Sequence, residues 1–444
     1  MTHKTIINIC LTLIALCWTV AIQAQTAIVD GINYSLNADA KTAGVTKSNV
    51  TGDIVIPEKI TVDGVEYSVT SIGYEAFKDC KALTSVAMPS VTAINDHAFN
   101  YCSNLTSVDM PSVTSIGSQA FAKCKALTSV AMPSVTSIGY DAFGSCSSLA
   151  SVAMPSVTSI KEQGFSGCSS LTSVDMPLAT SIGEYAFSNC SSLTSVTMPS
   201  VTSIGGYAFS SCSSLTSVDM PSVTSIGNAA FSGCPIINLS LPATLTSIGN
   251  SCFTATREIT LAATAPATLG TDVFWKYAVI RVPESSVDAY RNAAGWSNYK
   301  DLIFSMSDIT DYDVPVTAQE KESGLLDVIT QDNLGKVVSL KVTGTINGYD
   351  IMVIRNKMPN LHYLDLTDAT IVANDYAYYT GYHTEDNIIG NHMFASLYKL
   401  LSVKLPKNAT LINNWALSGC VSLTEVVLPV KLEVLGQGVF KLCI

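Results

Sequence analysis

Charged residues are scarce in this chain, and basic residues are fewer than acidic ones. Asp, Glu, Lys and Arg together make up 13% of the 444 residues, about half the share found in an average soluble domain. The formal net charge is −11, and no block of Lys and Arg interrupts the acidic balance. This composition argues against nucleic acid or an anionic membrane surface as a partner.

The signatures of enzymes and metal sites are also missing. The five histidines are scattered along the chain, at His3, His97, His362, His383 and His392. No His-Glu-x-x-His, Gly-x-Ser-x-Gly or phosphate-binding loop occurs, and no Cys-x-x-Cys suggests a metal site. We therefore predict no catalytic residues, no metal and no cofactor. An enzyme with an unrecognised site is kept as the second alternative function.

A long apolar run occurs only at the N-terminus. A short positive start precedes the mostly apolar stretch 6–22, and Ala24 offers a small residue for cleavage. This pattern predicts a signal peptide over 1–24, a secreted or cell-surface location and no transmembrane segment in the rest of the chain. Two other interpretations stay open. One is a lipid anchor at Cys17, although Leu16 stands where a small residue is expected, and the other is a retained N-terminal anchor.

The chain is rich in one 22-residue period. Cysteine recurs at eight positions with this step, and a phenylalanine stands three residues before each cysteine. The cysteines are Cys80, Cys102, Cys124, Cys146, Cys168, Cys190, Cys212 and Cys234. The phenylalanines are Phe77, Phe99, Phe121, Phe143, Phe165, Phe187, Phe209 and Phe231. So strict a period predicts one structural unit copied along an axis, with equivalent side chains stacked into columns.

One unit, residues 127–148, combines two hydrophobic patterns. Apolar and small polar residues alternate over 129–132, which indicates a strand with one face inward. Pro133 ends this strand, since proline has no N–H for a ladder. Residues 135–138 read as a second short extended piece, and the apolar positions within 142–146 as a single helical turn.

The columns argue against disulfides between the repeat cysteines. All eight occupy one phase of the repeat, so their Cβ atoms should point the same way. Stacked strands lie about 4.8 Å apart, whereas a disulfide needs Cβ atoms about 3.8 Å apart and turned toward each other. We predict that these cysteines are buried, reduced and packed as small hydrophobic residues.

A stack of coils needs covers at its ends, because a single coil cannot bury its apolar face alone. Before the repeats, residues 60–69 alternate around Asp63-Gly64 and predict a β-hairpin cap. After them, the pattern predicts a strand at 279–283 and a helix at 285–294. Large aromatic residues for closing this end are Trp275, Tyr290 and Trp296.

A second unit follows a stretch that reads as a linker. Strands are predicted at 340–344 and 361–366, with a helix at 348–358 between them, and the repeat phase returns over 400–443. The repeat stops mid-unit at Ile444. This predicts either a truncated product or an exposed repeat edge that self-associates or is covered by a partner.

The domain prediction follows these signals. The expected parts are a signal peptide at 1–24, an N-terminal β cap at 25–71, a repeat array at 72–256, a capping segment at 257–306, a linker at 307–318 and a second repeat unit at 319–444.

Two surfaces are candidates for binding a partner. The first is the outward strand face of the array, which is small, flat and weakly acidic. Its candidate residues are Ser107, Asp109, Ser173, Asp175, Ser217 and Asp219. It lacks the aromatic and Arg anchors of binding hot spots, so a merely solvated face stays an alternative to a broad, weak contact surface.

The second candidate is a tyrosine-rich insertion in the second unit, residues 374–383. Tyrosine provides a large contact area at low entropic cost, as in binding loops. The residues in question are Tyr376, Tyr378, Tyr379, Tyr382 and His383. The alternative is an insertion that packs its tyrosines on its own domain.

The repeat pattern Leu-x-x-Val-x-Met-Pro-x-Val-x-x-Ile-Gly-x-x-Ala-Phe-x-x-Cys resembles the BspA-like class of leucine-rich repeat found on surface and secreted proteins of anaerobic bacteria. The resemblance covers residues 72–253 and 395–444. It implies an α/β solenoid: a right-handed coil with short parallel strands on one face, extended segments, single-turn helices and a second, smaller array. It also implies adhesion to extracellular-matrix or plasma proteins, and it carries no catalytic residues.

Together these observations predict an exported, non-enzymatic leucine-rich repeat protein that binds a protein or glycan of a host or matrix. The first alternative is a structural spacer or a self-associating surface module.

Overall fold

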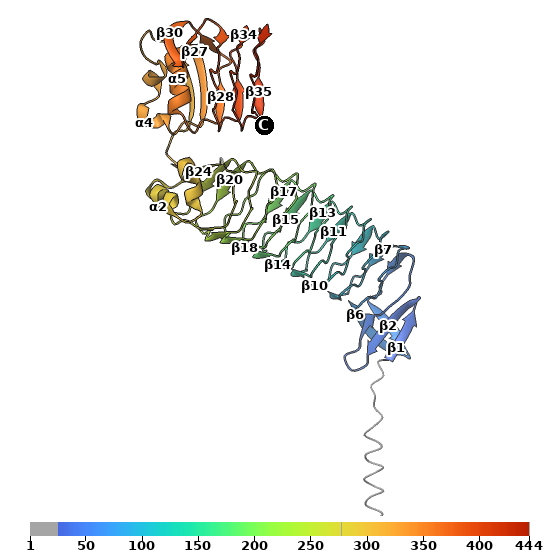
Figure 1. Cartoon of the computed structure of the whole chain (residues 1–444). Coiled ribbons are helices and arrows are strands. Elements are labelled where there is room, and N and C mark those ends of the chain that lie inside the picture. The colour runs from blue at the N-terminus through green and yellow to red at the C-terminus, as the bar shows by residue number, and fades with distance from the viewer. Residues whose placement is uncertain (1–24, 277, 444) are drawn as a thin grey trace, which may run out of the picture. The chain divides into compact units, whose positions relative to one another are not determined.

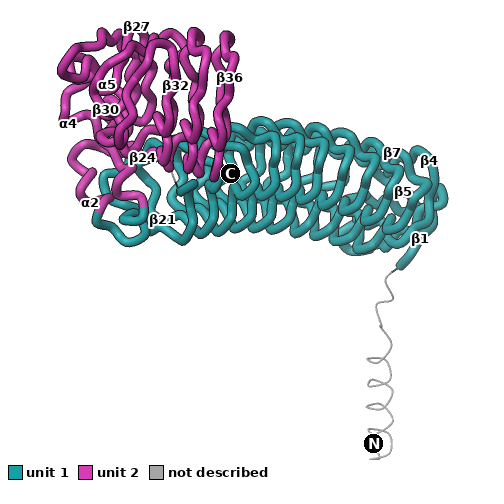
Figure 2. Tube along the Cα trace, turned by 45° about the horizontal axis from the view of Figure 1, so that its top comes forward, with its two compact units in different colours: residues 1–278, 292–298 teal, residues 279–291, 299–444 magenta. Residues whose placement is uncertain are grey.

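The computed structural model of the protein describes residues 25–276 and 278–443 (Figure 1). The chain forms two compact units (Figure 2). Among the described residues, the first unit comprises 25–276, 278 and 292–298, and the second comprises 279–291 and 299–443. The predicted signal peptide, residues 1–24, lies outside the described residues.

The first unit is a parallel solenoid, as predicted. Each coil contributes one two-residue strand to a ladder that follows the N-terminal cap strand β6 (Val65–Ile72). These strands are β8 (Ala93–Ile94), β10 (Ser115–Ile116), β12 (Ser137–Ile138), β14 (Ser159–Ile160), β16 (Ser181–Ile182), β18 (Ser203–Ile204), β19 (Ser225–Ile226), β21 (Ser247–Ile248) and β23 (Thr268–Leu269). Ile116 lies opposite Ile138 and Ile138 opposite Ile160, so the register repeats the 22-residue period.

A second set of strands comes from the alternating segment before the Met-Pro step. One group contains β4 (Gly52–Val55), β7 (Leu83–Ala87) and β9 (Ser107–Asp109); the next contains β11 (Ser129–Ala131), β13 (Ser151–Ala153), β15 (Ser173–Asp175) and β17 (Ser195–Thr197). In the last coils β20 (Asn238–Leu241) pairs with β22 (Glu258–Leu261). The predicted alternation is confirmed, because Val130 is buried between exposed Ser129 and Ala131.

The core of the first unit is a continuous column of phenylalanine rings. Each predicted Phe is fully buried and stacks on its neighbour, from Phe77 to Phe231, with ring centroids 5.1 to 5.4 Å apart. The column continues beyond the predicted set through Phe253 and Phe274. It meets Trp296, whose indole N–H donates to the carbonyl of Ala267 at 2.8 Å. Trp296 therefore covers the last ring, as expected for a capping residue.

The single helical turns expected around residues 142–146 are instead hydrogen-bonded turns. Asp141 and Ser145 have φ of 51° and 59°, in the left-handed region that an α-helix excludes. The N–H groups of Phe143 and Ser145 donate to carbonyls of the next coil, at 2.8 and 2.7 Å, and not to carbonyls of their own segment. Pairing between coils therefore replaces the helix.

Ser and Thr side chains add a further layer of bonds between coils. Thr114 Oγ1 donates to the carbonyl of Thr92 at 3.1 Å, and its counterparts from Thr92 to Thr246 repeat this contact at 2.8 to 3.4 Å. Ser112 Oγ likewise donates to the carbonyl of Pro89 at 2.7 Å. The hydroxyl-rich composition thus serves the stacking of coils.

The cysteines form a buried column beside the phenylalanines. From Cys102 to Cys234, each Sγ donates to the carbonyl of the Phe 25 residues earlier, at 3.0 to 3.3 Å. Burial raises the pKa of Cys146 to about 12. The Cys146 thiol is thus held in a protonated, weakly reactive state.

The chain before the first coil forms antiparallel strands. Strands β1 (Gln25–Val29), β2 (Ile32–Asn37) and β3 (Thr42–Val45) follow one another, and β1–β2 and β2–β3 pair antiparallel. The predicted hairpin is β5 (Lys59–Val62) with β6, joined by the turn at Asp63-Gly64. Because β6 also pairs in parallel with β3 and β8, it connects the cap to the first coil.

The second unit is built around a parallel sheet in the order β26 (Asp311–Val316), β27 (Ser339–Ile346), β28 (Tyr363–Asp365), β33 (Ser402–Lys404) and β35 (Glu425–Val427), with β29 (Ala369–Ile371) also on β27. Strands β32 (Ile388–Ile389), β34 (Leu411–Ile412) and β36 (Val434–Leu435) form a second, parallel ladder. These positions confirm that the repeat phase returns after residue 400.

The helices of the described residues are short. They are η1 (Glu284–Ser286), α2 (Val287–Asn292), η2 (Trp296–Leu302), α3 (Leu325–Val328), α4 (Gln331–Leu334) and α5 (Gly348–Lys357). Strands β24 (Val279–Val282) and β25 (Ile303–Ser305) pair in parallel on either side of α2 in sequence. Helix α5 begins at a capping box in which Asn347 accepts from Tyr349 N–H and Asp350 accepts from Asn347 N–H.

The predicted linker 307–318 needs correction, because most of it belongs to the second unit's sheet. Residues Asp311–Val316 form β26, which pairs with β27 along its whole length. Alternation of exposed Asp311 and Asp313 with half-buried Tyr312 and Val314 is a strand signal that the acidic composition masked. Pro315 is tolerated because β26 is an edge strand.

Candidate binding surfaces

The outward strand face of the first unit presents its predicted residues to solvent. Ser107, Asp109, Ser173, Asp175, Ser217 and Asp219 are all exposed. Asp175 lies opposite Thr197, which is bridged in turn to Asp219, so the acidic side chains are separated by small polar ones. The face offers no large side chain at these positions to fill a partner's pocket.

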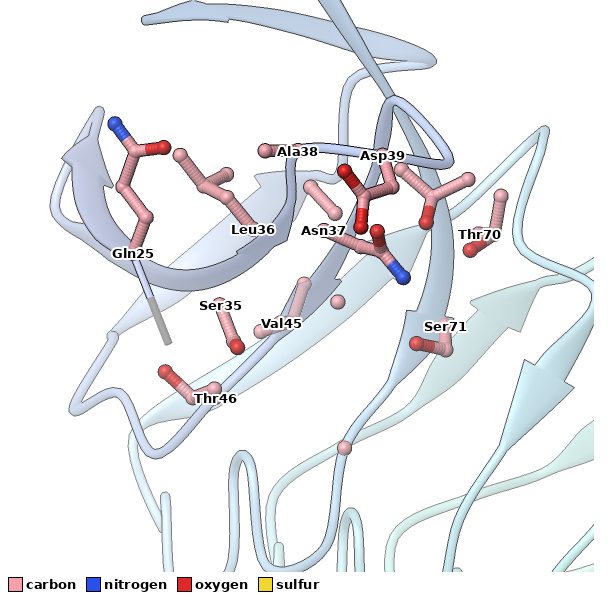
Figure 3. A pocket seen from close by; sticks show the side chains of 14 residues that line it. Gln25, Ser35, Leu36, Asn37, Ala38, Asp39, Val45, Thr46, Thr70 and Ser71 are labelled. Carbon is pink, nitrogen blue, oxygen red and sulfur yellow. The ribbon is translucent and has the colours of Figure 1, made fainter. Parts of the chain in front are cut away.

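The N-terminal cap carries a hollow of about 880 Å³ (Figure 3). Ser35, Asn37, Thr46 and Thr70 contribute polar side chains to its walls, and Asp39 contributes a carboxylate. Its lining contains no aromatic ring or basic group. The hollow is therefore polar but lacks an anchor for a specific ligand.

The tyrosine-rich insertion is a β-hairpin made of β30 (Asn374–Tyr379) and β31 (Tyr382–Thr384). Its tyrosines have different roles. Tyr378 is buried at 3% exposure, and its hydroxyl donates to the carbonyl of Asn391 at 2.9 Å. Tyr376 is half-buried, whereas Tyr379 and Tyr382 are exposed at the end of the hairpin.

His383 is exposed beside these residues. The alternative that the insertion packs on its own domain is confirmed for one tyrosine, and a role of the exposed side chains in binding stays a prediction. Tyr378 packs on its own domain, while Tyr379 and Tyr382 are presented to solvent.

The exposed tyrosines join an aromatic patch that sequence inspection did not identify. We define the aromatic patch as Tyr379, Tyr382, His392, Trp415, Arg355 and Lys441. The His392 ring lies 5.3 Å from Tyr379 and 5.9 Å from Tyr382, and 6.4 Å from Trp415 in a near-parallel arrangement. Four rings from the hairpin and two successive coils thus lie next to one another.

Two cations complete the patch. The Arg355 guanidinium lies 4.7 Å from the Tyr379 ring centroid, and Lys441 Nζ lies 4.7 Å from the Trp415 ring centroid. Arg355 Nη1 also donates to the carbonyls of His392 and Met393, so this side chain links helix α5 to the coil that carries His392. Partial burial lowers the pKa of Arg355, yet an arginine stays charged at neutral pH.

A sequence signal for this patch existed in the repeat register. His392 and Trp415 occupy the same position of successive coils, two residues before Phe394 and Leu417, and both have positive φ. The following coil has Gly438 there, where an added Cβ would lie 2.8 Å from the Trp415 ring. Glycine at that position therefore leaves room for the indole.

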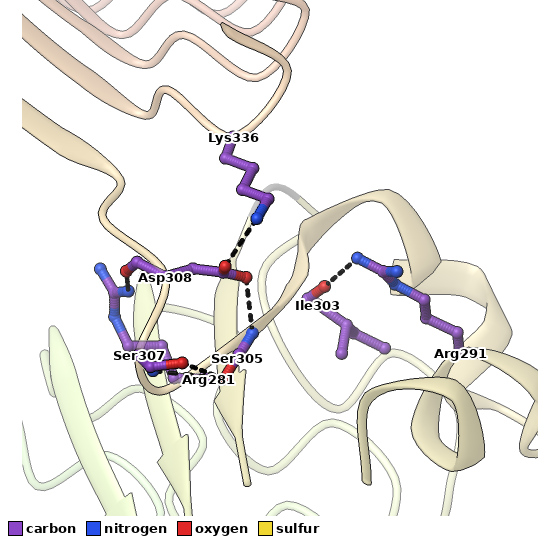
Figure 4. A network of polar contacts seen from close by, with 7 residues as sticks. All are labelled: Arg281, Arg291, Ile303, Ser305, Ser307, Asp308 and Lys336. Carbon is purple, nitrogen blue, oxygen red and sulfur yellow. Dashed lines mark hydrogen bonds and ion pairs between the residues drawn. The ribbon is translucent and has the colours of Figure 1, made fainter. Parts of the chain in front are cut away.

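The acidic segment 308–313 is a structural network and not a cluster of free carboxylates (Figure 4). Asp308 pairs with Lys336 at 2.7 Å and accepts from Ser305 N–H at 2.9 Å. Partial burial raises the pKa of Asp308, but these hydrogen bonds outweigh burial and leave the pKa below its usual value. Asp313 pairs with Lys341 at 2.7 Å.

The described residues, 25–276 and 278–443, hold neither a cluster of metal ligands nor a membrane-spanning helix. They contain no group of three His, Cys, Asp or Glu side chains placed to hold a metal ion. Their helices are all too short or too polar to cross a bilayer.

Comparison with known proteins identifies the repeats. The model of the BspA type leucine rich repeat region matches six copies, within residues 58–172, 136–260 and 382–444. Similar solved structures include a leucine-rich repeat protein from Bacteroides ovatus, 22% identical over 94% of this chain and 92% of that chain, with a TM-score of 0.45. No curated protein matches the chain.

Two further solved structures are similar. A leucine rich cell surface protein from Faecalibacterium prausnitzii is 20% identical over 91% of this chain and 94% of that chain, with a TM-score of 0.38. A leucine-rich repeat protein of T. pallidum is 31% identical over 43% of this chain and 91% of its own, with a TM-score of 0.39. The matched repeats cover more than half of the residues, and the chain belongs to the BspA-type leucine-rich repeat family.

Proposed function

We propose that this chain is an exported, non-enzymatic surface protein that binds a protein partner through the aromatic patch of its second unit. The observation that carries the proposal is the gathering of exposed Tyr379 and Tyr382 with Trp415 and Arg355. Trp, Tyr and Arg are the residues enriched in binding hot spots. The named positions on the outward strand face of the first unit lack these anchors.

Hydrogen bonds to the backbone hold the aromatic patch in place. Tyr378 anchors the hairpin through its hydrogen bond to Asn391, and Arg355 is held by two backbone carbonyls. The rings therefore lose little conformational freedom when a partner binds, which favours affinity. Export and a cell-surface location are parts of the same proposal, motivated by the apolar N-terminal stretch 6–22.

Binding to purified collagen, laminin, fibronectin and fibrinogen would test the proposal. The protein from residue 25 onward would be measured by biolayer interferometry against each immobilised partner. Replacing Trp415 or Tyr382 by Ala should weaken binding about 30-fold, as expected for about 2 kcal/mol at a hot spot.

The matched control replaces Asp109, Asp175 and Asp219 together by Ala and should leave affinity unchanged. Loss of binding in this control, with normal binding by the Trp415 variant, would indicate that the partner binds the first unit and not the aromatic patch. Clean negatives on all four proteins would remove the matrix-binding role.

Self-association is the second candidate, and one observation favours it. In the coil that follows β35, large apolar side chains are exposed: Leu428 at 42%, Val430 at 86%, Val434 at 55%, Leu435 at 50% and Leu442 at 66%. Another coil can stack on this surface, and a second copy of the chain could supply it. Light scattering over a range of concentrations tests this, and Leu435→Lys should abolish any oligomers that form through this coil.

A further inference from the structure

A second hollow is lined in part by the start of the same hairpin and shares no residue with the aromatic patch. It has a volume of about 520 Å³, within the range of small-ligand sites. The side chains that line it come from the first turn of α5, the start of β30 and the segment before α3: Tyr349, Asn374, Asp375, Tyr376, Glu320 and Lys321. Helix α5 and strand β30 are in direct contact, as Figure 1 shows.

The walls of this hollow are closely fitted. An added Cβ at Gly348 would lie 2.3 Å from the carbonyl oxygen of Tyr376, so only glycine lets helix and strand approach this far. Asn347 Nδ2 donates to the carbonyl of Gln319 at 2.6 Å, and Asn374 Nδ2 donates to that of Glu320 at 3.4 Å. Both asparagines thus hold the segment that carries Glu320 and Lys321.

One wall is aromatic. The rings of Tyr349 and Tyr376 stack with centroids 3.7 Å apart and planes 18° apart. The Tyr376 hydroxyl lies 3.0 Å from Met352 Sδ, which holds this ring in place. The pair therefore forms a fixed, half-exposed apolar surface inside an otherwise polar hollow.

The remaining lining is polar and of mixed charge. Glu320 and Asp375 bring two exposed carboxylates, and Lys321 brings one ammonium group. The excess of negative charge disfavours sulfated, phosphorylated or sialylated ligands. The ammonium group of Lys321 offsets one of the two carboxylates, so the remaining attraction for a cationic side chain is weak at these exposed groups. Hydroxyl groups suit such a lining, because each one can both donate to a carboxylate and accept from an ammonium group.

We propose that this hollow binds one sugar ring of a neutral glycan. The apolar C–H face of the ring lies against the Tyr349–Tyr376 pair, and its hydroxyls donate to Asp375 and Glu320 and accept from Lys321. This site goes beyond the protein-binding role of the aromatic patch and uses none of the patch residues. The two sites can therefore be tested separately.

The experiment uses the protein from residue 25 onward and a panel of neutral oligosaccharides: maltotetraose, mannotetraose, chitotetraose and lacto-N-tetraose. Saturation-transfer NMR would identify binding and calorimetry would measure the affinity. At least one member should bind, and Tyr376→Ala should weaken it about tenfold. Tyr376→Phe should retain binding, because it keeps the ring.

A variant with an intact hairpin guards against misfolding. Asp375→Ala changes an exposed side chain and should also weaken binding while the melting temperature stays unchanged. The control Trp415→Ala should bind the sugar normally. The proposal is overturned if no member of the panel binds, if Trp415→Ala alone abolishes sugar binding, or if a sialylated oligosaccharide or a lysine-rich peptide binds in place of the neutral sugars. None of these results decides whether the patch binds a protein.

Discussion

The hydroxyl of Tyr378 donates to the carbonyl of Asn391, 2.9 Å away, and this contact joins the hairpin to the repeat coil behind it. The neighbouring Gly390 makes the contact feasible, because a Cβ there would lie 2.2 Å from the Tyr378 oxygen. Tyr378 thereby sets where Tyr379 stands relative to His392. One buried residue of the hairpin positions the exposed ones.

Removing this hydroxyl should loosen the hairpin. Tyr378→Phe deletes a buried hydrogen bond, and we expect a loss of about 1 kcal/mol. Hydrogen exchange of residues 374–384 should become faster, while the first unit is unaffected. The control is Tyr379→Ala, which changes a neighbouring exposed side chain. It should leave the hydrogen-exchange rates of the backbone amides around Tyr378 unchanged. Equal exchange in Tyr378→Phe and wild type would mean that the hairpin is anchored elsewhere.

The phenylalanine column should be the most sensitive part of the first unit. Phe143 is fully buried between Phe121 and Phe165 at 5.1 Å on each side. Phe143→Ala leaves a cavity and should destabilise the unit by about 3 to 5 kcal/mol, measured by urea unfolding. Tyr140→Ala in the same coil removes a side chain that is 39% exposed and serves as the control. Similar unfolding midpoints for the two variants would contradict a shared Phe core.

The ladder cysteines should be reduced and slow to react. With the pKa of Cys146 at about 12, the thiolate fraction at pH 8 is about one in ten thousand. We expect native protein from residue 25 onward to resist iodoacetamide at the eight ladder positions. Cys443, which is partly exposed, should react sooner. After denaturation all eight should titrate as free thiols, and oxidised ladder cysteines at that stage would refute the column geometry.

Acid should weaken the second unit through Asp308. Because the folded-state pKa of Asp308 is lowered, its carboxylate stabilises the fold above the unfolded pKa of about 3.9, and the contribution disappears as the pH falls through the folded pKa. Asp308→Asn should therefore be less stable than wild type at pH 7 by about 1 kcal/mol, and this difference should vanish once the pH has fallen below the folded pKa of Asp308. Calorimetry at several pH values measures this.

The control for the acid experiment is Asp313→Asn. Asp313 also pairs with a lysine, but its side chain is 62% exposed and it should matter little. A difference for Asp308→Asn that persists unchanged at low pH would show that the charge is not the cause.

Sequence inspection was most successful where the chain repeats itself. The columns of Phe and Cys, the two strands of each coil and the N-terminal hairpin follow from the period and from local alternation. It was wrong about the helical turn around Phe143 and about the linker at 311–316. In both places the backbone pairs with a neighbouring strand or coil, and such a partner is not part of the local pattern.

For the candidate binding surfaces, the sequence marked the tyrosine-rich segment but did not show which of its tyrosines are buried and which are exposed. Composition marks 374–383 as tyrosine-rich, yet the local sequence does not indicate that Tyr378 is buried and Tyr379 is exposed. The register of β30 and β31, which shifts within the hairpin, decides this. Arg355 and Trp415 were overlooked because each is unremarkable in its own segment.

The sequence by itself determined a solenoid, because a short motif repeated at a constant step of 22 residues gives its core positions the same neighbours in every copy. Only the tertiary structure decided which side chains of the aromatic patch meet. Arg355, Tyr379 and Trp415 come from a helix, a hairpin and a coil, and their contacts depend on how these elements dock. The docking of these elements depends on contacts between residues outside the repeat pattern, such as Tyr378 with Asn391. The periodicity of the sequence does not predict such contacts.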